Sequence, residues 1–246
     1  MSNRQKVTKI LSVGICVIVL LLAGWFLIIG PKVVAYNIWL LRTTLVSDSI
    51  KRDAVGRLLV QGSKATANLI AALDQDSVRS PNLLVIETLG GIRDHSAVAP
   101  LLRVLNTAPT AREELIVWAI GRCGREEDAK SLIPCLSDEN PKVRARVITA
   151  ICELAPKRSF KVLFDGLQDP EGLVRTESRG SLERTFGVTF EADTTVSRAT
   201  RIPDGDEFKS WQINYRIALT KIGNWWTTES AKFPDQLEIS GSSGTK

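Results

Sequence analysis

The chain has 246 residues, of which 44% are hydrophobic, so most of it can fold around a core and is not disordered. Its 32 lysines and arginines exceed its 27 acidic residues by five and are spread along the chain, a mild surplus that does not by itself indicate a nucleic-acid partner. The single histidine, His95, excludes most metal sites and acid–base chemistries that need two or more imidazoles.

The N-terminal segment is typical of a membrane anchor. Residues 10–30 are 21 positions without a charged side chain. A helix of that length spans about 31 Å, which matches the roughly 30 Å hydrocarbon core of a bilayer. Arg4, Lys6 and Lys9 precede the run without an acidic neighbour. This charge bias predicts a cytoplasmic N-tail, residues 1–9, and an exported remainder.

Two alternatives to this anchored topology remain open. Lys32 and Arg42 follow the apolar run, so the inverted orientation is one of them. The other is a cleaved signal peptide, residues 1–35, because Val33-Val34-Ala35 offers small residues at a cleavage position, although the run exceeds the roughly 7–15 apolar residues usual in signal peptides. Trp25, near the outer end of the run, and the residues that follow it resemble an interfacial belt: Pro31, Lys32, Tyr36 and Trp39. For Trp39 the alternative is core packing in the first repeat.

The central part of the chain repeats. Leu105, Leu136 and Leu167 each precede a polar break and are 31 residues apart. Leu73 lies 32 residues before Leu105, and Leu41 lies 32 residues before Leu73. A fixed period of this length is the signature of stacked repeat units.

Two further columns share this register. One holds small residues, namely Thr88, Ala119, Ala150 and Ser181, and the other holds aliphatic residues, namely Leu89, Ile120, Ile151 and Leu182. The loops repeat too, since Asp138 precedes Arg144 by six residues and Asp169 precedes Arg175 by six. Within one unit the apolar spacing is helical, as in Val143, Val147, Ala150, Ile151 and Leu154. The repeat pattern therefore predicts about five helix–turn–helix units in residues 33–188, which must stack to bury their apolar faces.

These units resemble HEAT repeats, in particular the short bacterial form called the phycobilin-lyase-type HEAT-like repeat. The shared features are the Leu-x-Asp breaks Leu136-Ser137-Asp138 and Leu167-Gln168-Asp169, the Val-Arg that opens the second helix, and Gly90, Gly91, Gly121 and Gly124 near the ends of second helices. One unit departs from the pattern, with Arg112-Glu113 in place of Val-Arg and Thr107-Ala108-Pro109 in place of the aspartate. The resemblance implies an all-α fold, an α–α superhelix of the HEAT-like α-solenoid type, here preceded by one transmembrane helix.

The segment 189–233 is predicted to be a loop followed by an amphipathic capping helix. Asp204 and Glu207 form a capping box, and an apolar stripe follows at helical spacing: Phe208, Trp211, Tyr215, Leu219, Ile222 and Trp226. We expect this helix to cover the open end of the last repeat. Residues 234–246, which are rich in serine and glycine, are predicted to be a flexible tail.

The aromatic residues of this helix have a second interpretation. Trp211, Trp225 and Trp226 would form a partner-binding patch, because aromatic residues are enriched at interfaces. Gly187 and Phe190, followed at a distance by the two adjacent tryptophans, also resemble the ending of other bacterial membrane-anchored HEAT proteins.

Residues for catalysis or cofactor binding are not evident. The chain holds no phosphate-binding loop, nucleophile elbow or dinucleotide fingerprint, and the iron hydroxylases of this architecture need several His-Glu pairs. Cys16, Cys123, Cys135 and Cys152 form no C-x-x-C pair and are expected to be core residues. His95 is expected to be a solvated turn residue. The sequence therefore predicts no catalytic, cofactor-binding or metal-binding residue, and no small-molecule substrate.

A protein partner is the remaining expectation. Arg144, Arg146, Arg175 and Arg179 lie on successive second helices, here called helices B, and would offer a basic stripe to an acidic protein. The alternative is a ladder of hydrogen bonds between these arginines and Asp138 or Asp169. We expect a single-pass membrane protein that acts as a non-catalytic protein-interaction scaffold. A secreted or soluble accessory subunit of an enzyme complex, with residues 1–35 removed, is the alternative.

Overall fold

The computed structural model describes residues 32–75, 82–107, 113–194 and 205–238. All regular secondary structure in these residues is helical, which confirms the all-α prediction and agrees with an α-solenoid. None of the described helices is long and apolar enough to cross a bilayer. The predicted N-tail, residues 1–9, and the predicted membrane helix, residues 10–30, lie outside the described residues.

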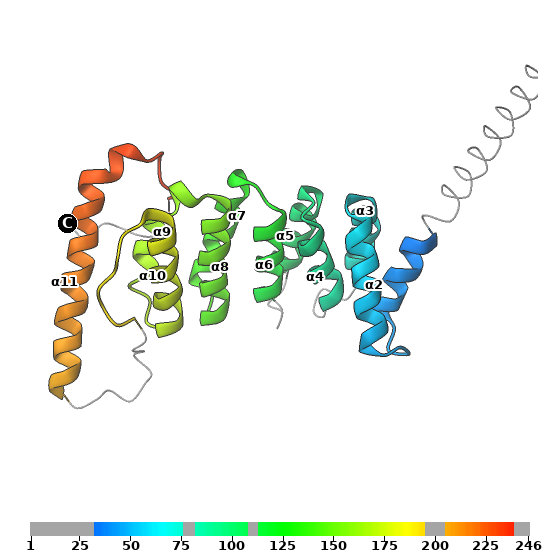
Figure 1. Ribbon diagram of the computed structural model, residues 1–246, viewed down its shortest axis with the longest axis horizontal. Coiled ribbons are helices and arrows are strands. Elements are labelled where there is room, and N and C mark those ends of the chain that lie inside the picture. Colours follow the sequence, from blue (N-terminus) through cyan, green and yellow to red (C-terminus); the bar gives the residue numbers. More distant parts are fainter. Residues whose placement is uncertain (1–31, 76–81, 108–112, 195–204, 239–246) are drawn as a thin grey trace, which may run out of the picture.

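Helices in residues 32–186 form successive pairs arranged along one axis (Figure 1). The first members, helices A, are residues 32–42, α3 (Ser63–Gln75), α5 (Val98–Thr107), α7 (Ala129–Leu132) and α9 (Phe160–Gly166). The second members, helices B, are α2 (Asp48–Gln61), α4 (Leu83–Ile92), α6 (Glu113–Cys123), α8 (Pro141–Leu154) and α10 (Gly172–Phe186). Short 3-10 turns connect or extend them: η1 (His95–Ala97), η2 (Glu126–Asp128), η3 (Ile133–Ser137) and η4 (Pro156–Arg158).

Local sequence signals set where the helices B begin and end. Asn82 caps α4 by accepting hydrogen bonds from the backbone N–H groups of Leu84 and Val85, and Asn140 caps α8 in the same way. Gly187 ends α10 with a φ of 69°, a left-handed conformation that suits a residue without a Cβ. Arg93 ends α4 with a φ of 61°, so a non-glycine residue takes this conformation there.

Asp94 begins the turn that leads into α5, and its loss is expected to cost about 1 kcal/mol at neutral pH. Its carboxylate accepts hydrogen bonds from the backbone N–H and the hydroxyl of Ser96, chiefly the former, and these bonds lower the pKa of Asp94. A carboxylate with a lowered folded-state pKa stabilises the fold above its unfolded pKa of about 3.9 and loses this effect as pH falls through the folded value.

Urea unfolding of the wild type and of Asp94→Ala checks this prediction. The difference in unfolding free energy should be present at pH 7 and shrink below about pH 4. Asp94→Asn is the matched control, because an amide caps without titrating, so its stability should not share this loss. A wild-type advantage over Asp94→Ala that persists unchanged at low pH would show that the carboxylate does not act as described.

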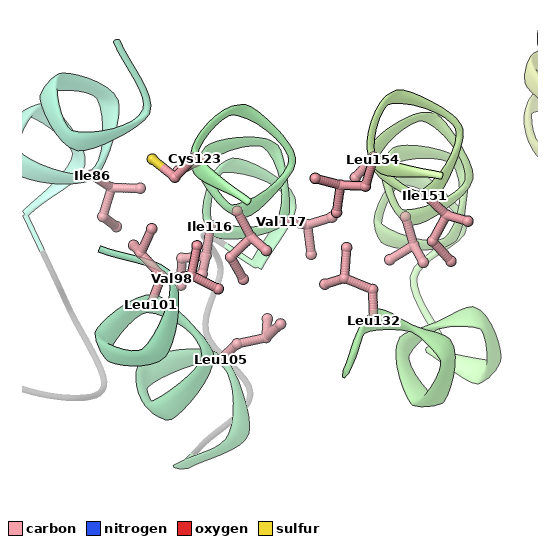
Figure 2. Close-up of a cluster of buried hydrophobic side chains, with 14 of the residues drawn as sticks. Ile86, Val98, Leu101, Leu105, Ile116, Val117, Cys123, Leu132, Ile151 and Leu154 are labelled. Atoms are coloured by element: carbon pink, nitrogen blue, oxygen red, sulfur yellow. The ribbon is translucent and has the colours of Figure 1, made fainter. Parts of the chain in front are cut away.

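The repeat columns form the core between the pairs. Leu89, Ile120, Ile151 and Leu182 are fully buried, and the small residues beside them are buried as well. Figure 2 shows side chains of successive pairs meeting between the helices, with Val117 of α6 facing Leu132 of α7 and Leu154 of α8. The period therefore marks the positions at which each pair buries its apolar face against the next.

Helices B of successive pairs pack directly on one another, whereas successive helices A make few contacts. Glycine permits the close approach: a Cβ built on Gly121 would lie 2.9 Å from the Cβ of Ala150, and one built on Gly90 would meet the ring of Trp118. Helices B therefore form the more closely packed row of the stack.

The helix α11 (Gly205–Glu229), followed by η5 (Ser230–Lys232), covers the last pair, as Figure 1 shows. Its residues Tyr215, Ala218 and Ile222 are buried. Tyr215 donates a hydrogen bond from its hydroxyl to the backbone oxygen of Leu167, and burial raises the pKa of this tyrosine to about 12. The ring of Phe190, in the loop before α11, is buried edge-on against Tyr215.

The prediction of a flexible tail is wrong for residues 234–238. Leu237 is fully buried, and its backbone N–H donates to the oxygen of Arg158 at 3.1 Å. Gln236 accepts from the backbone N–H of Phe160 and donates to the oxygen of Lys157. Hydrogen bonds to the η4 turn thus hold a segment that carries no periodic signal of its own.

Candidate functional site

Two of the four predicted arginines are structural. Arg144 makes a two-pronged contact with Asp169 of the next turn, with both N–O distances at 2.8 Å, and donates to the backbone oxygen of Asp138 at 2.7 Å. The side chains of Arg144 and Asp169 are only 11% and 12% exposed, and the hydrogen bond to Asp169 raises the pKa of Arg144. The predicted ladder is therefore present here, and it joins one pair to the next.

Arg175 occupies the equivalent position one repeat later and is 3% exposed. Its guanidinium donates to the backbone oxygens of Asp169 and Pro170, both at 2.7 Å, and lies 5.7 Å from the ring centre of Trp211. Burial under α11 removes this side chain from any surface that a partner can reach. Neither Arg144 nor Arg175 belongs to an exposed basic stripe.

Arg146 and Arg179 are partly exposed on helices B, but each lies beside a glutamate. Arg146 contacts Glu114 of the preceding helix B at 3.4 Å, and Arg179 contacts Glu183 one turn later at 3.0 Å. The surface along helices B is therefore a row of alternating charges. A row of mixed charges can orient a partner whose own charges are complementary, but it does not attract an acidic protein as a purely basic stripe would.

A shallow groove of about 360 Å³ crosses this surface. It is lined by Glu114 of α6, by Lys142, Ala145, Arg146 and Thr149 of α8, and by Leu173 and Glu177 of α10. Leu173 is half exposed, an apolar side chain among charged neighbours. Sequence reasoning missed it, although one signal was present: Leu173 lies 31 residues after Lys142, so a leucine replaces a lysine on the exposed side of the repeat.

The three predicted tryptophans belong to the cap. Trp226 stacks on Phe160 of α9 with ring centres 3.9 Å apart, and Trp225 contacts the same ring at 6.0 Å. Trp211 donates from its indole nitrogen to the backbone oxygen of Asp193 and stacks against Tyr215. All three are partly buried in contacts within the chain, which favours their capping role over a partner-binding patch.

His95 lies in the expected turn, but its side chain contacts another side chain as well as solvent. Its Nε2 lies 2.9 Å from a carboxylate oxygen of Asp128, which also accepts from the backbone N–H of Arg125. This contact links the turns of two successive pairs. Within the ranges that the structure describes, no cluster of three or more histidine, cysteine or acidic residues could hold a metal ion.

Three cysteines, Cys123, Cys135 and Cys152, are expected to react slowly with thiol reagents. Burial raises the pKa values of Cys123 and Cys152 to about 11 and also raises that of Cys135. In a Cys16→Ser background, Cys123 and Cys152 of the folded protein at pH 8 should react about a hundredfold more slowly with Ellman's reagent than a free thiol does, and Cys135 should also react more slowly than a free thiol. All three cysteines should react in denaturant. A fast-reacting thiol in the folded state would contradict this prediction.

Comparison with known proteins found a match for part of the chain only. No curated protein matches the chain. One family model does match, over the region that contains the last two helix pairs and most of the groove. Residues 129–187 match the model of HEAT repeats.

Proposed function

We propose that this protein is a single-pass, membrane-anchored α-solenoid that binds another protein along its helix-B surface and has no catalytic activity of its own. HEAT repeats generally mediate protein–protein interaction, and the match covers α8 and α10 of the groove. The observation that carries the proposal is the groove itself, where Leu173 is exposed between charged side chains.

The groove favours a polypeptide partner of mixed charge. Lys142 and Arg146 line it together with Glu114 and Glu177. An apolar side chain of the partner would cover Leu173, while acidic and basic groups on either side would pair with the surrounding charges. This balance of charges in the groove favours a polypeptide over a nucleic acid, which would pair with a continuous basic track.

The anchor remains a proposal that rests on residues 10–30 of the sequence and on the packing of residues 32–42. These latter residues form the first helix A, in which Val34 and Ile38 are buried. Cleavage after Ala35 would remove Val34 and shorten the first helix of the stack. This packing supports a retained anchor over the cleaved-signal alternative. The N-tail would be cytoplasmic and the repeats exported, as the charges before the anchor predict.

A photo-crosslinking amino acid at Leu173 tests the binding surface. Ser131 on α7 is the matched control, because it is exposed on a helix A. In intact cells, position 173 should capture one defined protein that position 131 does not. Arg146→Glu should reduce this capture without unfolding the protein, because Arg146 is partly exposed. Equal capture from both positions, or capture that Arg146→Glu leaves unchanged, would rule out the helix-B surface as the binding site.

A further inference from the structure

The outer face of the first helix pair exposes apolar side chains. Along residues 32–42, Val34, Ile38 and Leu41 turn inward and are buried, whereas Val33, Tyr36 and Trp39 are exposed. Tyr36 and Trp39 are each more than half exposed and stack on one another at 6.0 Å. Terminal repeats of a solenoid in water need a polar outer face. The alternative that Trp39 packs in the core is therefore wrong, and its exposure needs another cause.

The register of the first pair shows which end of it lies nearest the predicted anchor. Arg57 of α2 donates from Nε to the side-chain oxygen of Asn37 at 2.9 Å, so the two antiparallel helices are level at these residues. Val60 of α2 therefore lies level with Val34, close to the residue at which the described chain begins. Leu45 lies in the loop at the opposite end, about 15 Å away along the helix axis. Figure 1 shows this loop at the lower end of the first pair.

Both ends of the pair thus offer an exposed apolar side chain. Val60 is 90% exposed at the anchor-side end, and Leu45 is 84% exposed at the other end. The two ends differ in the side chains around them. Val33 and Tyr36 are exposed near the anchor-side end, on the helix that follows residues 10–30 in the sequence.

The positive charge of the protein is also concentrated here. Residues 32–61, the first pair, contain five basic residues, namely Lys32, Arg42, Lys51, Arg52 and Arg57, and two acidic ones, Asp48 and Asp53. Residues 62–246 contain 24 basic and 25 acidic residues. The first pair therefore carries a surplus of three positive charges, whereas the chain that follows it has one more acidic than basic residue. This polarity complements a surface of negative charge.

We infer that the first pair rests on an anionic phospholipid surface, with Tyr36 and Trp39 in the headgroup layer, Val33 and Val60 against it, and Lys32, at the anchor-side end, near lipid phosphates. The inference rests on the proposed anchor, because the uncharged run of residues 10–30 ends two residues before Lys32. Tyrosine and tryptophan favour this layer, and each nearby lysine or arginine adds attraction to anionic lipid. The contact would hold the stack at a fixed angle to the membrane and replace a polar cap.

The test uses the full chain in nanodiscs that each hold one molecule, with a benzophenone amino acid at Val60 or, as the matched control, at Leu45. After illumination, intact mass spectrometry measures lipid adducts. We expect about tenfold more adduct at position 60 than at position 45. Adding roughly 30% phosphatidylglycerol to phosphatidylcholine should increase the adduct at position 60. Equal adducts at both positions, or none at position 60, would overturn the inference.

Variants test whether the lipid adduct at position 60 depends on Tyr36 and Trp39. Tyr36→Ser with Trp39→Ser should reduce the adduct at position 60 several-fold, whereas Ile213→Ser with Ile217→Ser, at two exposed positions of α11, should leave it unchanged. In liposomes that hold several copies, an adduct of twice the protein mass would identify a second copy as the occupant instead. A crosslink within the chain leaves the intact mass unchanged and would be located by peptide mapping, where it would identify the chain's own N-terminal segment. Either result would overturn the inference.

The experiment distinguishes an error in the proposed membrane anchor from an error in the proposed lipid contact of the first pair. A chain without a retained anchor would not copurify with nanodiscs at all. A chain that copurifies but gives no adduct at position 60 would keep the anchor and exclude the lipid contact of the first pair.

Discussion

Replacing Asp169 with alanine is expected to lower the free energy of unfolding by about 3 kcal/mol. The change leaves the guanidinium of Arg144 almost fully buried without its carboxylate, and it removes the acceptor of the backbone N–H of Glu171. Removing one partner of a buried pair costs more than the pair contributes, because the remaining charge stays out of water. Urea unfolding followed by circular dichroism measures the loss.

The matched control is Asp138→Ala, in the equivalent position one repeat earlier. Asp138 accepts a hydrogen bond from the backbone N–H of Asn140. The residue that would supply its arginine, 31 positions before Arg144, is Glu113. Asp138→Ala should therefore cost about 1 kcal/mol, the value of a lost turn contact. Equal losses for the two variants would show that the ion pair with Arg144 adds little.

Replacing Phe160 with alanine is expected to cost about 4 kcal/mol and to loosen α11. Phe160 is buried at the point where α9, α10 and α11 meet, stacked on Trp226 and edge-on to Phe186. Its removal leaves a cavity and also takes the aromatic partner from the cap. Thermal unfolding measures the lost stability, and hydrogen exchange should show faster exchange throughout α11.

Phe208→Ala is the comparison for this change. Phe208 lies near the start of α11, where it stacks on Trp211 and is partly exposed. Its loss should cost about 1 kcal/mol and leave exchange near Trp226 unchanged. If Phe160→Ala leaves the protection of α11 intact, the aromatic cluster does not hold the cap in place.

The repeat period predicts the core well because each column records burial in the same place of every pair. Leu89, Ile120 and Ile151 recur 31 residues apart, and all three are fully buried. A residue that packs against the neighbouring pair has an equivalent that must do the same, so the sequence carries the constraint several times. The all-helical fold is predictable because the apolar spacing within each unit is helical.

Single contacts across the stack are harder to predict. Arg144 and Arg146 are two residues apart on one helix, yet one is buried with Asp169 and the other is partly exposed beside Glu114. Their roles depend on how the next turn and the previous helix are placed, which a 31-residue period does not specify. The burial of Arg175 depends on α11, which lies outside the repeat.

Contacts made once have no periodic signal at all. Leu237 reaches the oxygen of Arg158, and Gln236 reaches Lys157, 79 residues away in the chain. Composition suggests a tail because serine and glycine are frequent just beyond these residues. The docking of this short segment becomes visible only in the folded protein.

The intact mass of the protein isolated from the membrane fraction tests the anchored solenoid most directly. A retained anchor predicts a chain that begins at Met1 or Ser2, includes residues 10–30 and stays with the membrane after an alkaline wash. The packing of the first helix pair also favours an uncleaved chain, because cleavage after Ala35 would remove its buried residue Val34. A mature chain that begins at Tyr36 and is found in the soluble fraction would contradict the membrane-anchored scaffold.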